Sequence, residues 1–293
     1  MIPSPKYPGL PYPRDVRLVR VDSRGQEQWS RLLGGPLDGV RGLHLVDARS
    51  AVLITLTQEP ASAPMKAQLH WFDLEGKSVR SVPLQVDAYA GSTAVDARGR
   101  LGILLHTGQV PETRTRLALV RQDGTVEEEI ALEEGMASSL APAEDGWIVV
   151  GNSVSSHVPP EERWLHVARV KSNAVVWTRK LPCSEPADHG ESRVDLGGFA
   201  AGRETIAIVT HGRNSEGDRL VLDTLSLDGT PRKRQVLFRT LSIIAHAAAF
   251  TPSGGLYIAG TMSGAASFGE SQVNTLEPVD RNHEGFLLYV ERP

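Results

Sequence analysis

Two stretches of this sequence carry nearly the same turn and decide the fold: LHLVDARSAVLITL at residues 43–56 and STAVDARGRLGILL at residues 92–105. Their turns begin at Val46 and Val95, which lie 49 residues apart. In each stretch a strand rich in small residues leads through the turn into a very apolar strand. Short apolar runs ended by turn residues predict β-strands, and their return at a fixed spacing predicts a repeat protein.

This inner hairpin recurs at residues 139–151, 196–210 and 247–260. It alternates with a more polar, outer hairpin at residues 18–33, 69–84, 117–132, 165–181 and 222–238. Most turns of the outer hairpin read Asp-x-x-Gly or a variant of it, in which Asp caps the turn and Gly supplies a positive φ. In the copy at residues 165–181, Asn173 holds the turn position and Ala174 replaces Gly.

Four strands in about 50 residues are typical of one blade of a β-propeller. Ala, Gly and Ser suit the innermost strand, where blades converge, and charged residues suit the outer strands. A sandwich of generic hairpins is the alternative, but a sandwich has no reason to repeat at a fixed period. We therefore expect an all-β fold, a β-propeller of about five to six four-stranded blades.

The chain opens with an outer hairpin and ends with an inner hairpin, a long loop at residues 263–284 and a lone strand at residues 285–291. We expect the N- and C-terminal strands to share the closing blade, because an open ring leaves strand edges unpaired. One strand is left over, and it either extends that blade or indicates a partner chain. Residues 1–13, rich in Pro and Gly, are expected to form an extended arm, and residues 14–293 a single β-propeller domain.

Composition narrows the possible functions. Hydrophobic residues make up 40% and charged residues 23%, which is typical of a globular protein. A net charge of -4 gives no basic surface for nucleic acid. The first residues contain no apolar run, so we expect no signal peptide in this chain and no membrane insertion. With Cys183 as the only cysteine, an intrachain disulfide and a thiolate metal cluster are excluded.

Residues 247–291 resemble a family of repeats. The family pattern is D-x-x-G-N-x-Y-x-x-G, followed by a Gly-rich loop with Phe-Gly and then by G-x-D-x-F-x-x-K. The residues that correspond to its first part, its loop and its last part are, in order, Ser253, Gly254, Leu256, Tyr257 and Gly260, then Phe268 and Gly269, then Gly285, Phe286 and Leu287. This pattern resembles the bacterial β-propeller repeats of the SBBP-like type, and the outer hairpins are also similar to quinoprotein-type propeller repeats. Thr251 and Glu284 depart from the usual Asp. The resemblance implies a propeller and a bacterial surface or extracytoplasmic setting, but no catalytic residues.

Standard catalytic motifs are absent from the sequence. It contains no G-x-x-x-x-G-K-[ST], no G-x-S-x-G and no H-E-x-x-H, and the tryptophan docking series of quinone-dependent dehydrogenases is not evident. Trp29 and Trp177 hold matching positions in the outer hairpins, so we interpret them as packing residues.

Candidate site residues come from the predicted innermost strands. A propeller active site needs polar side chains that converge from different blades on the central axis. The alternative is that each of these side chains forms hydrogen bonds within its own blade. The candidates are Arg41, His44, Ser138, Ser139, Asp195 and His246.

Two segments outside the strands are also candidates for binding. Residues 183–191 hold four possible metal ligands, but without a recognised ligand spacing, which favours a polar loop between blades. The long loop at residues 263–284 either carries binding or only covers the closing blade. We expect no metal and no cofactor.

The fold and the missing motifs favour a non-enzymatic propeller scaffold that binds a protein or glycan through its face loops. One alternative is a propeller enzyme, a glycan hydrolase or lyase or an oxidoreductase, with a site at the central axis. Another is a subunit of a larger assembly, with a partner chain. We expect no nucleic-acid partner. The resemblance favours an extracytoplasmic or cell-surface location, which the residues themselves do not fix.

We predict that a chelator leaves the stability of the protein unchanged, because no ligand set has metal-site spacing. The measurement is the thermal midpoint with and without EDTA. A large fall in that midpoint would refute the prediction and direct attention to His189 in the segment at residues 183–191.

Overall fold

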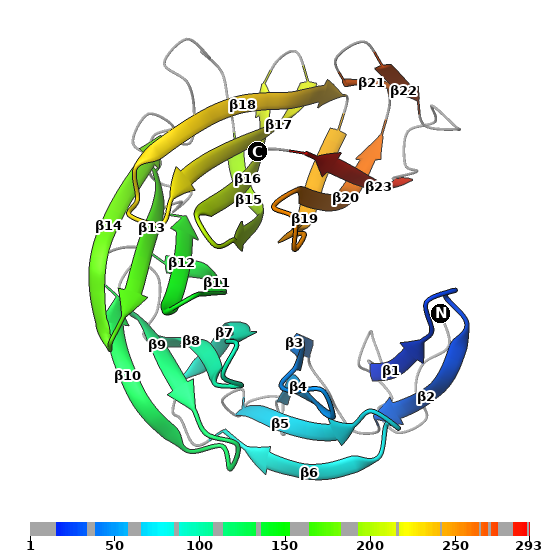
Figure 1. Ribbon diagram of the computed structural model, residues 1–293, viewed down its shortest axis with the longest axis vertical. Coiled ribbons are helices and arrows are strands. Elements are labelled where there is room, and N and C mark those ends of the chain that lie inside the picture. Colours follow the sequence, from blue (N-terminus) through cyan, green and yellow to red (C-terminus); the bar gives the residue numbers. More distant parts are fainter. Residues whose placement is uncertain are drawn as a thin grey trace, which may run out of the picture. The chain divides into compact units, whose positions relative to one another are not determined.

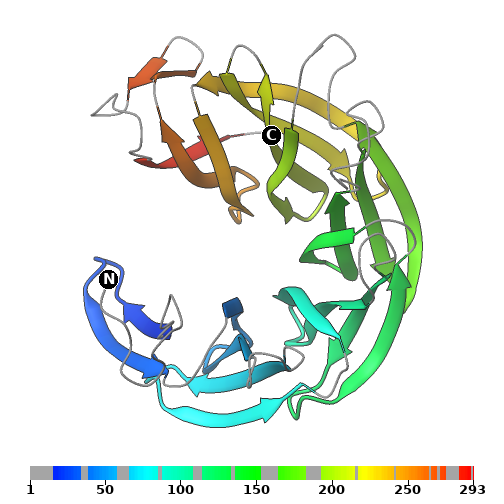
Figure 2. The same ribbon diagram turned by 180° about the vertical axis from the view of Figure 1, so that it is seen from behind.

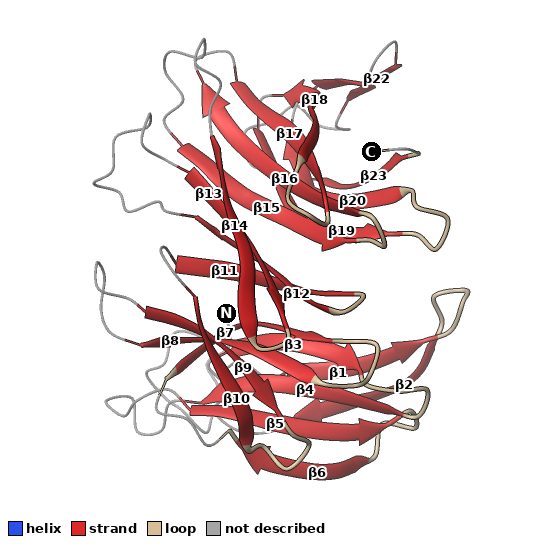
Figure 3. Ribbon diagram, turned by 60° about the vertical axis from the view of Figure 1, so that its left-hand side comes forward, coloured by secondary structure: helices blue, strands red, loops and turns tan. Residues whose placement is uncertain are grey.

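The structure is a computed structural model of the 293-residue chain. It describes residues 16–33, 39–57, 66–84, 88–107, 114–132, 136–152, 164–182, 193–214, 217–240, 242–263, 265–268, 271–274, 284–291 and 293. Within these residues every regular element is a β-strand, as Figure 3 shows, and no helix is long and apolar enough to cross a bilayer. Contacts divide the chain into two compact units, Met1–Ala131 and Leu132–Pro293, which we describe separately.

The first unit begins with a hairpin and continues with two four-stranded antiparallel sheets, drawn in blue to green in Figures 1 and 2. The hairpin consists of β1 (Val16–Val21) and β2 (Glu27–Leu33). The next sheet contains β3 (Gly39–Leu45), β4 (Ser50–Thr57), β5 (Lys66–Asp73) and β6 (Ser78–Pro83). The last contains β7 (Tyr89–Val95), β8 (Leu101–Thr107), β9 (Arg114–Val120) and β10 (Val126–Leu132).

The second unit contains two further four-stranded sheets and a three-stranded one. Its strands are β11 (Met136–Ala143), β12 (Gly146–Asn152), β13 (Trp164–Lys171) and β14 (Ala174–Pro182), then β15 (Arg193–Ala201), β16 (Thr205–Asn214), β17 (Gly217–Ser226) and β18 (Pro231–Thr240). The three-stranded sheet joins β19 (Ser242–Phe250), β20 (Leu256–Ser263) and β23 (Glu284–Val290). A small hairpin of β21 (Ala265–Phe268) and β22 (Ser271–Asn274) lies between β20 and β23 in sequence.

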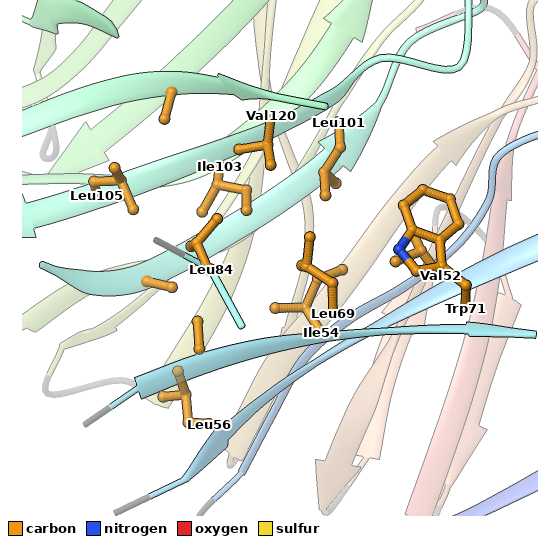
Figure 4. Packing of buried hydrophobic residues seen from close by; sticks show 13 residues of the cluster. Val52, Ile54, Leu56, Leu69, Trp71, Leu84, Leu101, Ile103, Leu105 and Val120 are labelled. Carbon is orange, nitrogen blue, oxygen red and sulfur yellow. The ribbon is translucent and has the colours of Figure 1, made fainter. Parts of the chain in front are cut away.

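The second strand β4 is apolar because neighbouring sheets of the first unit bury both of its faces, with Leu53 in a cluster with Leu18 on one side and Ile54 in a second cluster on the other. Figure 4 shows this for the first unit, where Ile54 and Leu56 of β4 pack in one cluster with Ile103 and Leu105 of β8. All four side chains are at most 1% exposed. A sheet that buries both faces reads as a continuous apolar run, which explains the segment LITL in β4 and the segment ILL in β8.

Aspartate side chains form most of the tight turns. Asp73 Oδ1 accepts hydrogen bonds from the backbone N–H of Glu75 and of Lys77, and Gly76 follows with a φ of 76°. Asp22 makes the equivalent bonds in the first hairpin, and Thr251 Oγ1 takes the role of the missing Asp by accepting from the Gly255 N–H. The predicted turn chemistry is therefore confirmed, and it includes the turn that departs from the repeat pattern.

Two tryptophans connect neighbouring sheets within their own units. Trp29 Nε1 donates to the Leu74 carbonyl at 2.9 Å. Its ring packs so closely on Gly76 that a Cβ added there would lie only 2.8 Å from the ring. Trp177 repeats the arrangement. Its Nε1 donates to the Leu227 carbonyl at 3.1 Å, and a Cβ added to Gly229 would lie 3.0 Å from its ring. The interpretation of both as packing residues is confirmed, and the structure shows that they dock on the glycine turn of the following sheet.

The predicted fold class, an all-β propeller, is confirmed by the succession of antiparallel sheets that serve as blades. The long loop predicted at residues 263–284 needs correction, because it contains the hairpin β21–β22. Among the described strands β1 pairs with β2 and β23 with β20, so the shared closing blade stays a prediction. The single domain at residues 14–293 also stays a prediction, and the arm at residues 1–13 lies outside the described residues.

We predict that Gly76→Ala lowers the free energy of unfolding by about 2–5 kcal/mol. About 1–2 kcal/mol comes from the left-handed backbone and about 1–3 kcal/mol from the overlap with the Trp29 ring. Gly25→Ala is the matched control, because its φ is 77° and no atom lies within 4 Å of its Cβ position. Urea denaturation measures both variants. Equal losses would show that Trp29 does not dock on Gly76.

Candidate functional site

Each innermost strand contains a β-bulge at the same place in its sheet. The pairing register with the second strand breaks at Arg41 in β3, at residues 91–92 in β7, at Ser138 in β11, at Gly197 in β15 and at His246 in β19. A bulge bends its strand and re-aims the side chain that it carries. Three of the six candidates, Arg41, Ser138 and His246, are therefore bulge residues.

In the first unit the bulge brings β3 against β7. His44 Nε2 and Thr93 Oγ1 form a hydrogen bond of 2.8 Å, and the Thr93 hydroxyl also lies 3.5 Å from the Arg41 carbonyl, to which it donates. Thr93 is buried. A Cβ on Gly42 would overlap both Thr93 Oγ1 and the His44 ring, so only glycine leaves room for this contact. His44 thus fixes the two inner strands to each other.

Arg41 itself lies against an aromatic ring. Its guanidinium carbon is 4.8 Å from the centre of the Tyr89 ring, and the Tyr89 ring is 6.2 Å from the ring of His106 on β8. His106 Nδ1 forms a 3.1 Å hydrogen bond with Thr115 Oγ1, and a Cβ on Gly91 would overlap its Nε2. We call Arg41, Tyr89 and His106 the Arg41 patch.

The environment of the Arg41 patch disfavours positive charge. Burial lowers the pKa of Arg41 below its usual value. Burial also lowers the pKa of His106, and the positive charge of Arg41 adds to that effect. The Arg41 Nε atom is buried and has no hydrogen-bond partner among the described residues. The patch therefore presents a partly buried cation beside an imidazole whose protonation is disfavoured, which is an arrangement that attracts an anionic group.

The candidates of the second unit are engaged within their own sheets where their side chains are described. Ser138 Oγ donates to the Val150 carbonyl at 3.3 Å, and His246 Nε2 lies 3.3 Å from Thr261 Oγ1. Ser139 pairs with Val150 across the ladder, and Asp195 pairs with His211, although the Asp195 side chain lies outside the described residues. Because the six candidates are divided between two units, their convergence on one axis stays a prediction.

Sequence reasoning missed Tyr89, Thr93 and His106. The 49-residue repeat aligns His44 with Thr93, so the alignment contained a signal for their equivalence, though not for their contact. His106 lies on a second strand, where a histidine in an apolar run gives no sign that it faces the inner strands. The position of Tyr89 depends on the two-residue bulge at residues 91–92, and the sequence gives no signal from which that bulge could be predicted.

The Arg41 patch lies at one edge of its sheets. β3 and β7 begin at this edge, and β8 ends there. At the opposite edge the strands are joined by tight turns such as those at residues 74–77 and 121–125. Among the described residues no group of three or more His, Cys, Asp or Glu could hold a metal ion. The loop at residues 183–191 lies outside them.

Comparisons with known proteins find distant structural similarity and no family. No family model matches the chain, and no curated protein matches it. A protein of unknown function from Bacteroides caccae superposes with a TM-score of 0.50 at 10% identity, over 83% of this chain and 82% of that one. The β-propeller domain of the trilobed protease from Pyrococcus furiosus, described as having an open velcro topology, superposes with a TM-score of 0.47 at 12% identity, over 84% of this chain and 72% of that one. A glucose dehydrogenase superposes with a TM-score of 0.48 at 14% identity, over 77% of this chain and 80% of that one.

We predict that the protein loses stability as the pH falls below about 6.5. Burial lowers the pKa of His44, His70 and His106 below the ordinary 6.5, so the unfolded chain takes up protons before the folded one does. Aspartates such as Asp228, whose pKa its hydrogen bonds lower to about 2, weaken the fold only in stronger acid.

The measurement is the urea midpoint between pH 7.5 and pH 5, together with NMR titration of the histidine rings. A stability that stays constant over this range would contradict the lowered histidine pKa values.

Proposed function

We propose that the protein is a non-enzymatic binding module that takes a protein or glycan ligand at the edge where its inner strands begin. The observation that supports this most is the Arg41 patch, in which a cation and an aromatic ring are presented together. Tyr89 is 38% exposed, and Arg41 has no ion-pair or hydrogen-bond partner for its guanidinium among the described residues. Arg and Tyr are the side chains that most often anchor binding surfaces.

The described polar candidates support binding more than catalysis. His44, Ser138 and His246 each have a hydroxyl or carbonyl partner. The Thr93 hydroxyl beside His44 donates to the Arg41 carbonyl, so the imidazole does not accept its proton as the base of a nucleophile would. A propeller enzyme with an axial site remains the alternative. On the resemblance of residues 247–291 we also propose that the blades are SBBP-like repeats with quinoprotein-type outer hairpins, which is consistent with an extracytoplasmic or cell-surface location.

A role in a larger assembly is the second candidate, and one surface favours it. One face of the β19–β20–β23 sheet carries Leu287, which is 70% exposed. On the same face the rings of Tyr257 and Tyr289 lie 5.0 Å apart, with their planes tilted by 44°. The opposite face of the same sheet is packed through Ile258 and Leu288. An apolar face of this kind is typical of a contact surface.

A glycan array followed by mass spectrometry of the bound ligand tests the binding proposal. We expect Tyr89→Ala to remove the binding of the captured ligand, because the variant deletes the exposed ring and the support of Arg41. Val79→Ala is the control, since Val79 is 66% exposed and lies on the outer strand β6 of the same unit, away from the Arg41 patch.

The ligand should be recovered with unchanged mass. Recovery of a shortened or oxidised product would contradict the non-enzymatic proposal and support the axial enzyme. Binding that survives Tyr89→Ala would instead place the site elsewhere on the protein.

A further inference from the structure

Arg41 differs from other arginines of the first unit in what surrounds its charge. Arg17 pairs with Glu27 at 3.1 Å, Arg100 with Asp96 at 2.8 Å, and Arg20 donates to the Leu74 carbonyl. The guanidinium of Arg41 contacts the Tyr89 ring and has no carboxylate or carbonyl partner among the described residues. An arginine that is partly desolvated and lacks a counter-ion gains more from an incoming anion than one that is already paired.

The geometry around Arg41 is fixed before any ligand arrives. Thr93 holds the carbonyl of Arg41 and the ring of His44, and the absence of a side chain on Gly42 allows that contact. Arg41 is therefore presented by a bulge on a strand that is tied to its neighbour. A site that is organised in advance loses less conformational entropy on binding.

The neighbouring groups limit the chemistry of the ligand. The pKa of His106 is already lowered by burial and by Arg41, so the patch contributes one permanent positive charge. One guanidinium matches one carboxylate through paired N–H donors, and an exposed tyrosine ring beside it offers an apolar face with a hydroxyl group.

We propose that Arg41, Tyr89 and His106 bind the carboxylate and ring of a uronic acid unit in an acidic saccharide. This inference rests on the proposed binding function and names its ligand. Arg41 holds the carboxylate, Tyr89 packs against the sugar ring, and His106 lies at the edge of the site. An acidic peptide is the other source of a carboxylate, but one cation and one ring correspond better to a single sugar unit.

The test is isothermal titration calorimetry with trigalacturonate, the neutral trisaccharide galactotriose and a short Asp/Glu peptide. We expect trigalacturonate to bind at least about 10-fold more tightly than the other two, and Arg41→Gln to weaken it by about 10- to 100-fold through loss of a charge-assisted hydrogen bond. Arg80→Gln is the matched control, because Arg80 lies 5.3 Å from the Trp71 ring in the same unit and its loss should change nothing.

A second readout does not depend on any ligand. Arg41→Gln should raise the pKa of His106 in an NMR titration, because it removes the neighbouring charge, and it should leave the thermal midpoint unchanged. An unchanged His106 pKa would show that Arg41 does not lie where the site requires it.

Three outcomes of the calorimetry would overturn the proposal: no binding of trigalacturonate, equal binding to the Arg41→Gln variant, or tighter binding of the peptide. These three outcomes can be distinguished from a failure of the proposed binding function itself. A neutral glycan that binds, and is lost with Tyr89→Ala alone, would leave the binding module standing while removing the uronate site. Conversion of any saccharide would refute the binding module.

Discussion

The fold depends on the burial of second strands between neighbouring sheets. β4 shows this within the first unit, where Val52 and Ile54 lie in a cluster with Ile103 of β8. Leu53 points to the opposite face of the same strand and lies in a cluster with Leu18 of β1. Burying a side chain of this size stabilises the fold by about 1.5–3 kcal/mol, and neither face can be buried without an adjacent sheet. A single blade is therefore unstable by itself, and the repeat along the sequence follows from that requirement.

The same packing shapes the inner strands. At Gly198, a Cβ would lie 2.9 Å from the backbone of Ala247 on the next inner strand, so adjacent inner strands leave no space for a larger side chain. In three inner strands the bulge presents a residue with a side chain, Arg41, Ser138 or His246. At the bulge of β15 the position is still crowded, because a Cβ on Gly197 would lie 2.6 Å from the Ala245 side chain. The fold thus fixes where the variable side chains are presented, and the sequence of each blade decides the chemistry. In the first unit this produces the Arg41 patch.

The fold class could be predicted from the sequence because it depends on local chemistry. Asp73 and Gly76 act within one turn, and the apolar run after Asp47 reflects burial that any neighbouring sheet supplies. The site could be predicted only in part. Arg41 and His44 were found through their place in the repeat, but their partners depend on bulge geometry and on contacts between sheets. The docking of Trp29 was missed for the same reason, since its glycine partner lies in the following blade.

The most direct measurement of whether Arg41 holds a ligand anion is a crystal structure of the protein with trigalacturonate. The predicted result is a carboxylate within hydrogen-bond distance of the Arg41 guanidinium, about 2.7–2.9 Å, with the sugar ring against Tyr89. A structure in which the saccharide binds elsewhere, or in which a carboxylate of the chain itself occupies that position, would contradict it.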